Sequence, residues 1–395
     1  QRFAREAVTV ARLKHPSILE IYDYSGEESD ASYIATELLT GPTLKEFVQA
    51  HPDIPPEIVA CIGVRITRAL AAAHNEGVVH RDVKPENVML HERRDVKLTD
   101  FGIAQLIDMQ SMTSTGQVIG SPGHMAPEQV EGKDSDARSD LFSLGTVLYL
   151  LATGELPFKG RNAHQISKQI VEGRFGDPMQ LRPAIGGRLR GILLRCLELD
   201  PDRRYQKADD LAEDLDGFLL EMGIESPKAT LADYLDDPEV FSAHFREHTI
   251  VRLTELGEAA QKRRSVPAAL DYLNRVLAMD DGNPRVLAAV KRIGRRSTFR
   301  RSALVGAAAI VLFGMGVAVF EAPAGASFAA TMKLFHAIGT KTGEDTFVGN
   351  GNTGFNGGIL TRAPYYTQVG IPRASRAASN SRWLSRERKR IAMSP

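Results

Sequence analysis

Short β-type runs come first along the chain, and long helical patterns follow them. The early runs alternate apolar and polar residues over a few positions, whereas the later segments repeat apolar residues every three or four positions. The predicted strands are 17–24, 32–39, 88–90 and 96–99, and the predicted helices cover 1–14, 56–76 and most of 139–221. This order predicts an α+β chain, with a small β-containing part before a mainly helical part.

The chain between residues 222 and 294 changes character twice. Residues 222–250 show weak periodicity, and we expect a linker there. Residues 251–294 again show paired helical patterns and resemble one tetratricopeptide (TPR) unit, with a turn at Asp281-Gly282-Asn283-Pro284. A lone repeat cannot bury its own faces. Two interpretations therefore stay open for this TPR-like region: a helical segment that packs on something else, or a partner-binding module.

A segment of 18 residues without charge, 303–320, follows a cluster of Lys and Arg residues. At about 1.5 Å per residue, a helix of this length reaches roughly 27 Å, which matches a bilayer core. The alternative is a buried apolar helix, but the basic flank favours a single transmembrane helix with the preceding chain in the cytoplasm. Residues 321–395 are rich in Gly, Ser and Arg, and we expect a disordered tail.

Charge and cysteine content argue against a basic nucleic-acid-binding protein and against a disulfide-stabilised protein. The 49 Lys and Arg residues balance the 49 Asp and Glu residues, so no nucleic-acid partner is expected. The two cysteines, Cys61 and Cys196, both lie within helical patterns. This arrangement argues against a disulfide framework and fits a reducing compartment.

The strongest functional signal is the run His80-Arg81-Asp82-Val83-Lys84-Pro85-Glu86-Asn87. Asp100-Phe101-Gly102 follows, with its Asp 18 residues after Asp82, and Ala126-Pro127-Glu128 comes later. Three motifs in this order and spacing resemble the eukaryotic-type (Hanks-type) serine/threonine protein kinases, especially the bacterial membrane-anchored ones. The resemblance covers residues 1–221. It implies a bilobal kinase fold with an incomplete N-terminal β lobe and a mainly helical C-lobe, using ATP and Mg²⁺.

The resemblance assigns the catalytic and metal-binding roles. Asp82 matches the catalytic base, and Lys84 matches the residue that neutralises charge on the γ-phosphate. Asn87 and Asp100 match the two Mg²⁺ ligands, and both offer the hard oxygen donors that this ion prefers. A strand hairpin between these two ligands would hold both of them on one rigid support.

Further matches concern the nucleotide. Glu6 falls on the helix whose Glu pairs with the ATP-binding Lys of the family. Thr36 matches the gatekeeper of the hinge, and backbone groups of Glu37 and Leu39 would then face adenine. Met89 would form an apolar floor under the base, although a plain core role is equally compatible with the sequence.

Structural matches lie in the helical part. Asp140 resembles the buried Asp that braces the catalytic loop of the family. Glu128 and Arg204 resemble its structural ion pair.

The resemblance also implies the partners. Lys84 and Ser121 favour protein substrates that present Ser or Thr, whereas His124 stands where the family commonly has Tyr. Arg81 before the catalytic Asp suggests control by phosphorylation of the long loop. Self-association with autophosphorylation at Thr113, Ser114 or Thr115 is therefore expected.

The largest departure lies at the start of the sequence, because no Gly-rich loop and no ATP-contacting Lys precede Glu6. We expect an amino-terminally incomplete kinase that binds ATP weakly in this form. The alternative is a noncatalytic pseudokinase or scaffold that binds partners through the kinase lobe and the TPR-like region. A small-molecule phosphotransferase is a third possibility, but such enzymes seldom carry the Ala126-Pro127-Glu128 segment with its Arg204 partner.

Overall fold

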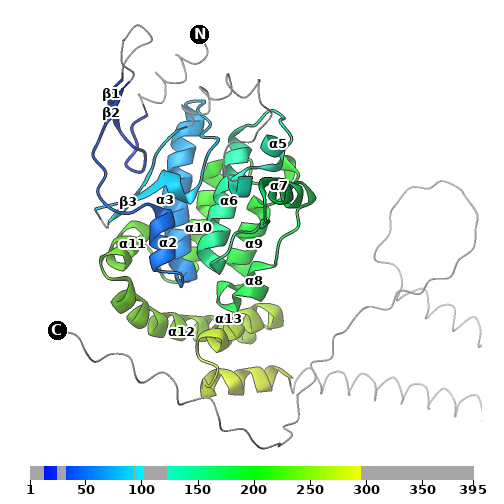
Figure 1. The fold of residues 1–395 in the computed structure, drawn as a ribbon. Coiled ribbons are helices and arrows are strands. Elements are labelled where there is room, and N and C mark those ends of the chain that lie inside the picture. Colours follow the sequence, from blue (N-terminus) through cyan, green and yellow to red (C-terminus); the bar gives the residue numbers. More distant parts are fainter. Residues whose placement is uncertain (1–12, 25–32, 93, 102–121, 295–395) are drawn as a thin grey trace, which may run out of the picture. The chain divides into compact units, whose positions relative to one another are not determined.

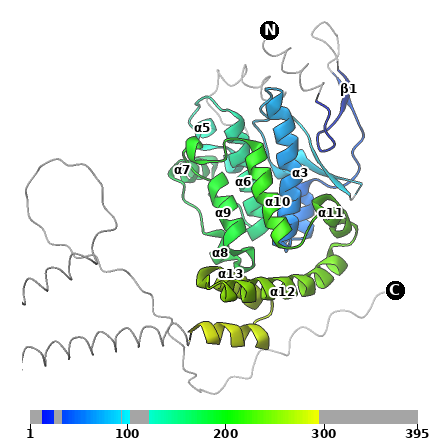
Figure 2. The same cartoon turned by 180° about the vertical axis from the view of Figure 1, so that it is seen from behind.

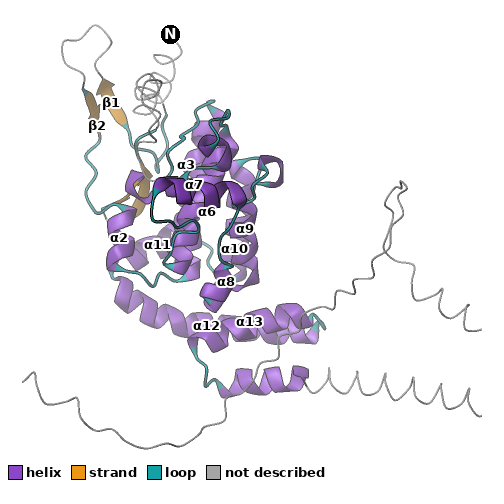
Figure 3. Cartoon of the chain, turned by 45° about the vertical axis from the view of Figure 1, so that its right-hand side comes forward, coloured by secondary structure: helices purple, strands orange, loops and turns teal. Residues whose placement is uncertain are grey.

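Two small antiparallel strand pairs accompany the helices in the computed structural model, which describes residues 13–24, 33–92, 94–101 and 122–294. β1 (Ile21–Tyr24) pairs with β2 (Ile34–Thr36), and β3 (Val88–His91) pairs with β4 (Asp95–Leu98). Figure 3 shows these strands in orange beside the mainly helical remainder. The four strand predictions are confirmed: β1 and β2 are shorter than predicted, β3 ends one residue later, and β4 begins and ends one residue earlier.

Helix α3 (Pro56–Asn75) forms the centre of the helical lobe. Proline is well tolerated in the first turn of a helix, and Pro56 occupies that position here. Figures 1 and 2 show from two sides that helices α6 (Ala137–Thr153) and α10 (Ala208–Glu221) lie along α3. The three helices share one hydrophobic core. The structure confirms the predicted helix 56–76 and the helix-rich lobe.

Shorter helices and 3-10 turns complete this lobe. Helix α9 (Gly186–Cys196) approaches α6 so closely that a Cβ atom on Gly145 would lie 2.5 Å from the Cβ of Cys196. Glycine is therefore required at this crossing. The remaining elements are α2 (Leu44–Ala50), α5 (Pro127–Val130), α7 (Ala163–Glu172), α8 (Pro178–Leu181), α9 (Gly186–Cys196), η1 (Pro85–Asn87), η2 (Pro122–His124), η3 (Pro183–Ile185) and η4 (Pro201–Arg203).

The structure differs from the linker expected over 222–250. This part of the chain forms α11 (Pro227–Asp236) and the first half of α12 (Pro238–Lys262). Leu231 and Tyr234 of α11 are buried in the same core as α3. Both helices begin with a polar capping residue followed by proline. These residue types are also common in loops, so the sequence at the two helix boundaries is easily taken for a linker.

The paired helices expected within 251–294 are confirmed. The second half of α12 packs against α13 (Val266–Met279), and residues 284–294 are also helical. Figures 1 and 2 show α12 and α13 lying against one end of the helical lobe.

Within the residues that the structure describes, no helix combines the length and the apolar character that a membrane span requires. The predicted transmembrane segment 303–320 and the predicted tail 321–395 lie outside the described residues.

Candidate active site

Asp82, Lys84 and Asn87 form one hydrogen-bonded cluster. Lys84 Nζ donates to Asp82 Oδ2 at 2.6 Å, and both side chains are about one third exposed. Asn87 Nδ2 donates to the backbone oxygen of Asp82 at 2.8 Å and to its Oδ2 at 3.0 Å. Both amide protons of Asn87 are therefore directed at Asp82, which leaves the amide oxygen as the atom suited to a cation.

The β3–β4 hairpin brings the segment around Asp100 next to Asn87. Val88 lies opposite Leu98 in the pairing, so the residues just before β3 and just after β4 are neighbours. The Thr99 N–H donates to the Asn87 carbonyl at 2.9 Å, and Asp100 follows directly. The hairpin support predicted for the two metal ligands is thus present, while their metal-binding role stays a prediction.

The donor set around Asn87 and Asp100 fits Mg²⁺, which binds one or two protein carboxylates or amides and completes its shell with phosphate and water oxygens. The described part of the chain contains no cluster of three or more His, Cys, Asp or Glu side chains that would hold a metal by themselves.

Asp140 on α6 braces the predicted catalytic loop, residues 80–87, as the resemblance implies. Its fully buried carboxylate accepts the backbone N–H groups of His80 at 2.8 Å and Arg81 at 2.7 Å. His74 in the last turn of α3 contacts the same carboxylate through Nε2 at 2.8 Å. Arg81 has a φ of 65°, an unusual value for a residue with a side chain. The carboxylate thus holds the backbone just before Asp82 in a strained conformation.

His80 links the catalytic loop to the segment after β4. Its Nε2 lies 2.9 Å from the Thr99 carbonyl, and its Nδ1 accepts the Asp82 N–H at 3.3 Å. A carbonyl can only accept, so the proton of this imidazole lies on Nε2. Burial lowers the pKa of His80, which keeps the ring neutral and suits this arrangement.

The predicted hinge lies after β2, and its side chains make contacts that the sequence did not indicate. The Glu37 carboxylate accepts Lys97 Nζ at 2.6 Å and the Glu20 N–H at 2.8 Å. Burial raises the pKa of Glu37, but these two donors outweigh it and the net pKa is lowered. The Glu37 carbonyl accepts the Thr36 hydroxyl at 3.0 Å. Lys97 on β4 thereby ties the hinge to the hairpin.

Leu39 and Met89 are both half-buried. Met89 lies on β3 and bridges to Thr43 through the backbone. The adenine floor at Met89 and the backbone contact at Leu39 stay predictions. Glu6, Thr113, Ser114, Thr115 and Ser121 lie outside the described residues.

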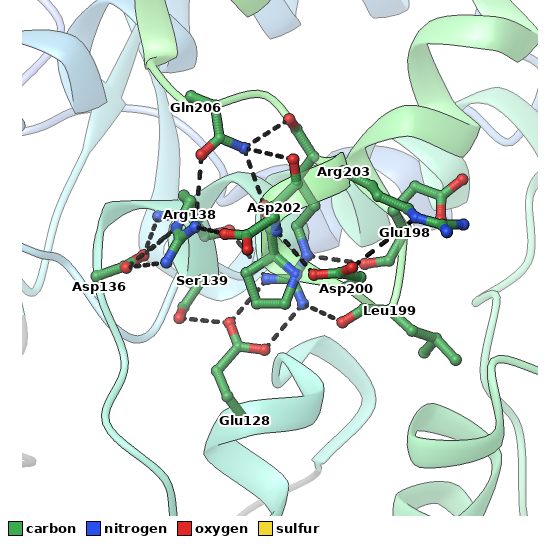
Figure 4. A network of polar contacts seen from close by, with 12 residues as sticks. Glu128, Asp136, Arg138, Ser139, Glu198, Leu199, Asp200, Asp202, Arg203 and Gln206 are labelled. Carbon is green, nitrogen blue, oxygen red and sulfur yellow. Dashed lines mark hydrogen bonds and ion pairs between the residues drawn. The ribbon is translucent and has the colours of Figure 1, made fainter.

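The predicted ion pair between Glu128 and Arg204 is confirmed. Two parallel hydrogen bonds of 2.7 and 2.8 Å join the guanidinium to the carboxylate, which also accepts the Ser139 hydroxyl at 2.6 Å. Arg204 further donates to the carbonyls of Glu198 and Leu199, and Figure 4 shows this network. Burial raises the pKa of Glu128, but the hydrogen bonds from Arg204 and Ser139 outweigh it and the net pKa is lowered.

Gln129, next to Glu128, connects this network to the catalytic loop. Its Nε2 donates to the Arg81 carbonyl at 2.9 Å, and its Oε1 accepts the Ala126 N–H at 2.9 Å. Sequence patterns do not indicate Gln129, Lys97 or His74. Each acts through a partner at least 48 residues away, and no local pattern marks it.

His124 is anchored to α6. Its Nδ1 lies 2.6 Å from Thr146 Oγ1, and the Thr146 hydroxyl donates to the Ser143 carbonyl at 2.7 Å. Since the hydroxyl has one proton, His124 must donate from Nδ1. Burial lowers the pKa of His124 to about 4. The residue that replaces the expected Tyr is therefore a neutral hydrogen-bond donor.

Comparison with known proteins identifies the family. The protein kinase domain family matches residues 1–214, which is more than half of the chain. The chain belongs to the protein kinase family. The motifs at Asp82, Asp100 and Glu128 all lie within the matched kinase region.

Three relatives of this kinase chain are bacterial. The serine/threonine-protein kinase PrkC of Bacillus subtilis is 37% identical over 215 residues, which cover 54% of this chain and 33% of PrkC. PknB of Mycobacterium leprae is 40% identical over 218 residues, covering 54% of this chain and 35% of PknB. The probable kinase CPE1738 of Clostridium perfringens is 36% identical over 216 residues, covering 55% and 31%. The chain thus spans only about a third of the length of these relatives.

Replacing Arg204 should destabilise this kinase strongly. Arg204→Met leaves the Glu128 carboxylate buried without its counter-charge, so the free energy of unfolding should fall by about 3–5 kcal/mol. The neighbouring Arg203 provides the control, because it is 74% exposed and lies 3.8 Å from Asp200. Arg203→Met should cost less than about 1 kcal/mol. Urea denaturation followed by circular dichroism measures both, and equal losses would contradict a stabilising role of the Glu128–Arg204 pair.

The neutral His124 should make stability depend on pH. The unfolded chain takes up a proton near pH 6.5 but the folded ring does so only near pH 4, so stability is lost as pH falls between these values. His124→Asn keeps a donor for Thr146 and removes the titration. The stability advantage of the wild type over this variant should shrink by about 2 kcal/mol between pH 7 and pH 5.

The exposed His164 on α7 is the matched control for this experiment. Its side chain is exposed to water, so the loss of stability that follows from burial of a neutral ring should be absent in His164→Asn. Urea titrations at each pH give the numbers. A constant difference between the wild type and His124→Asn would show that the folded protein accommodates a protonated imidazole.

Proposed function

We propose that this chain is a serine/threonine protein kinase that transfers the γ-phosphoryl group of ATP to Ser or Thr hydroxyls of proteins. The observation that carries this proposal is the cluster of Asp82 with Lys84 and Asn87 beside Asp100, in a chain of the protein kinase family. The relatives named as serine/threonine kinases support the substrate class.

The geometry supports the roles that the family resemblance assigns. Asp82 accepts the proton of the attacking hydroxyl and orients its oxygen, since phosphoryl transfer relies mainly on alignment and electrostatic stabilisation. Lys84, which contacts Asp82, supplies positive charge near the transferred group. Asn87 through its amide oxygen and Asp100 through its carboxylate would hold Mg²⁺. The magnesium ion would supply the charge that offsets the phosphate oxygens.

We propose further that phosphorylation of Thr113, Ser114 or Thr115 by a second copy of the chain controls activity. Arg81 supports this proposal, because its Nε is buried and has no hydrogen-bond partner among the described residues. A buried unsatisfied donor next to the catalytic Asp is costly, and a phosphate would provide three acceptor oxygens for it.

Membrane anchoring through residues 303–320 is also proposed, supported by the uncharged run and the basic residues before it. Removing residues 303–320 should shift the protein from the membrane fraction to the soluble fraction of expressing cells. Removing residues 345–362, which have the same length, is the control and should leave the distribution unchanged. Recovery of the intact chain in the soluble fraction would contradict the anchor.

Asp82→Asn should slow phosphate transfer strongly. Loss of the proton acceptor should lower the transfer rate by about 10²–10⁴-fold, measured as radiolabel moving from ATP to Ser and Thr of a general protein substrate. The exposed Asp210 on α10 provides the control, and Asp210→Asn should keep full activity. A parallel preparation includes any residues that the gene encodes before Gln1.

Peptide mapping of the labelled wild-type kinase locates autophosphorylation in the same experiment. Label within residues 104–120 is expected and should disappear in Asp82→Asn. A transfer rate of Asp82→Asn close to that of the wild type would contradict the catalytic role of Asp82. Nucleotide binding without transfer in every preparation would favour the pseudokinase alternative.

A further inference from the structure

Two charged side chains of helix α13, Arg275 and Asp271, provide partners for polar groups of the kinase lobe. Arg275 Nη2 donates to Glu57 Oε1 at 2.6 Å, with side chains that are only 4% and 1% exposed. Arg275 Nε also donates to the Ala184 carbonyl at 2.8 Å. Glu57 lies in the first turn of α3, and Arg275 is its only ion-pair partner in the described part of the chain.

Asp271 supplies the cap that α9 lacks in its own sequence. No side chain at the start of α9 accepts a hydrogen bond from its first turn. The two oxygens of Asp271 lie 2.8 and 3.0 Å from the Gly187 N–H, which donates to them. A carboxylate at this end of a helix satisfies a free backbone donor and also interacts favourably with the helix dipole.

Two glycines at the start of α9 allow α13 to approach closely. Gly186 has a φ of 72°, and a Cβ atom there would lie 2.4 Å from Arg275 Cδ. A Cβ on Gly187 would lie 3.2 Å from Asp271 Oδ1. The two consecutive glycines therefore allow the backbone of the lobe to approach the two charged side chains of α13.

A second contact joins α10 to the same helices. Tyr272 of α13 donates its hydroxyl to Glu221 Oε1 at 2.7 Å, and Arg252 of α12 donates to the Glu221 carbonyl at 2.9 Å. Leu273 and Val276 of α13 are fully buried in the core that includes α3. The contact surface of α13 is thus part polar and part apolar, like the interior of one domain.

We propose that α13 is a built-in ligand of the kinase lobe, so that residues 227–294 and the lobe unfold as one cooperative unit. The kinase family match ends at residue 214, well before this helix. Without α13, Glu57 would lose its ion-pair partner and α9 would lose the carboxylate that caps it. The TPR-like region accordingly uses this face within its own chain rather than for a separate partner. The proposal is independent of phosphate transfer.

Arg275→Met in the full chain tests this interface. Stranding Glu57 should lower the midpoint of thermal unfolding by about 10 °C, and the transition should stay single. Glu57→Gln combined with Arg275→Met removes both charges and should recover at least half of that loss. Arg285→Met is the control, because Arg285 is 61% exposed and pairs with Glu258 within the helical region. It should shift the midpoint by less than about 2 °C.

Hydrogen exchange distinguishes a cooperative unit from a separate module. Arg275→Met should speed amide exchange at least tenfold at residues 56–65 of α3 and at the start of α9. Asp271→Asn is a milder change, and it should speed amide exchange at least tenfold at the start of α9 alone. If Arg275→Met yields no folded protein while Arg285→Met folds normally, the exchange of Asp271→Asn decides. Faster exchange confined to residues 238–294, or a midpoint unaffected by Arg275→Met, would overturn the proposal.

Discussion

The buried carboxylate of Asp140 is the constraint on which the candidate active site depends. It accepts two backbone N–H groups of the catalytic loop while Arg81 holds a φ of 65°. Strain of this kind costs about 1–3 kcal/mol, whereas a hydrogen bond to a charged group contributes about 1.5–3 kcal/mol. Two such bonds outweigh the strain, so Asp82 stays in the position from which it bonds Lys84 and Asn87.

The sequence allowed the motif residues to be predicted, because their chemistry limits both residue type and spacing. Asp82, Asn87 and Asp100 lie on a loop and a hairpin that short-range patterns already indicate, and the periodicity of 56–76 predicted α3 to within one residue. Lys97, Gln129 and Arg275 could not be predicted in this way. Their partners are brought close only by tertiary packing, and an isolated Lys, Gln or Arg on a helix or strand usually indicates a solvated surface.

The helices in 222–262 show a second limit of sequence patterns. Helix α12 contacts α11 at one end and α13 along the other, so its apolar residues serve different neighbours. Such residues form no single apolar stripe, and the periodicity that indicates a surface helix is weak. The same two-sided packing explains why a segment that resembles a linker is ordered against the kinase lobe.

Helix α3 connects the candidate active site with the contact between α13 and the kinase lobe. Its first turn holds Glu57, which pairs with Arg275 of α13, and its last turn holds His74, which contacts Asp140. A helix of 20 residues spans about 30 Å, and its hydrogen-bonded backbone makes it stiff over that length. The residue that binds α13 and the residue that contacts Asp140 therefore lie at opposite ends of one rigid helix. In physical terms, the kinase lobe of this chain extends past the last residue of its family match.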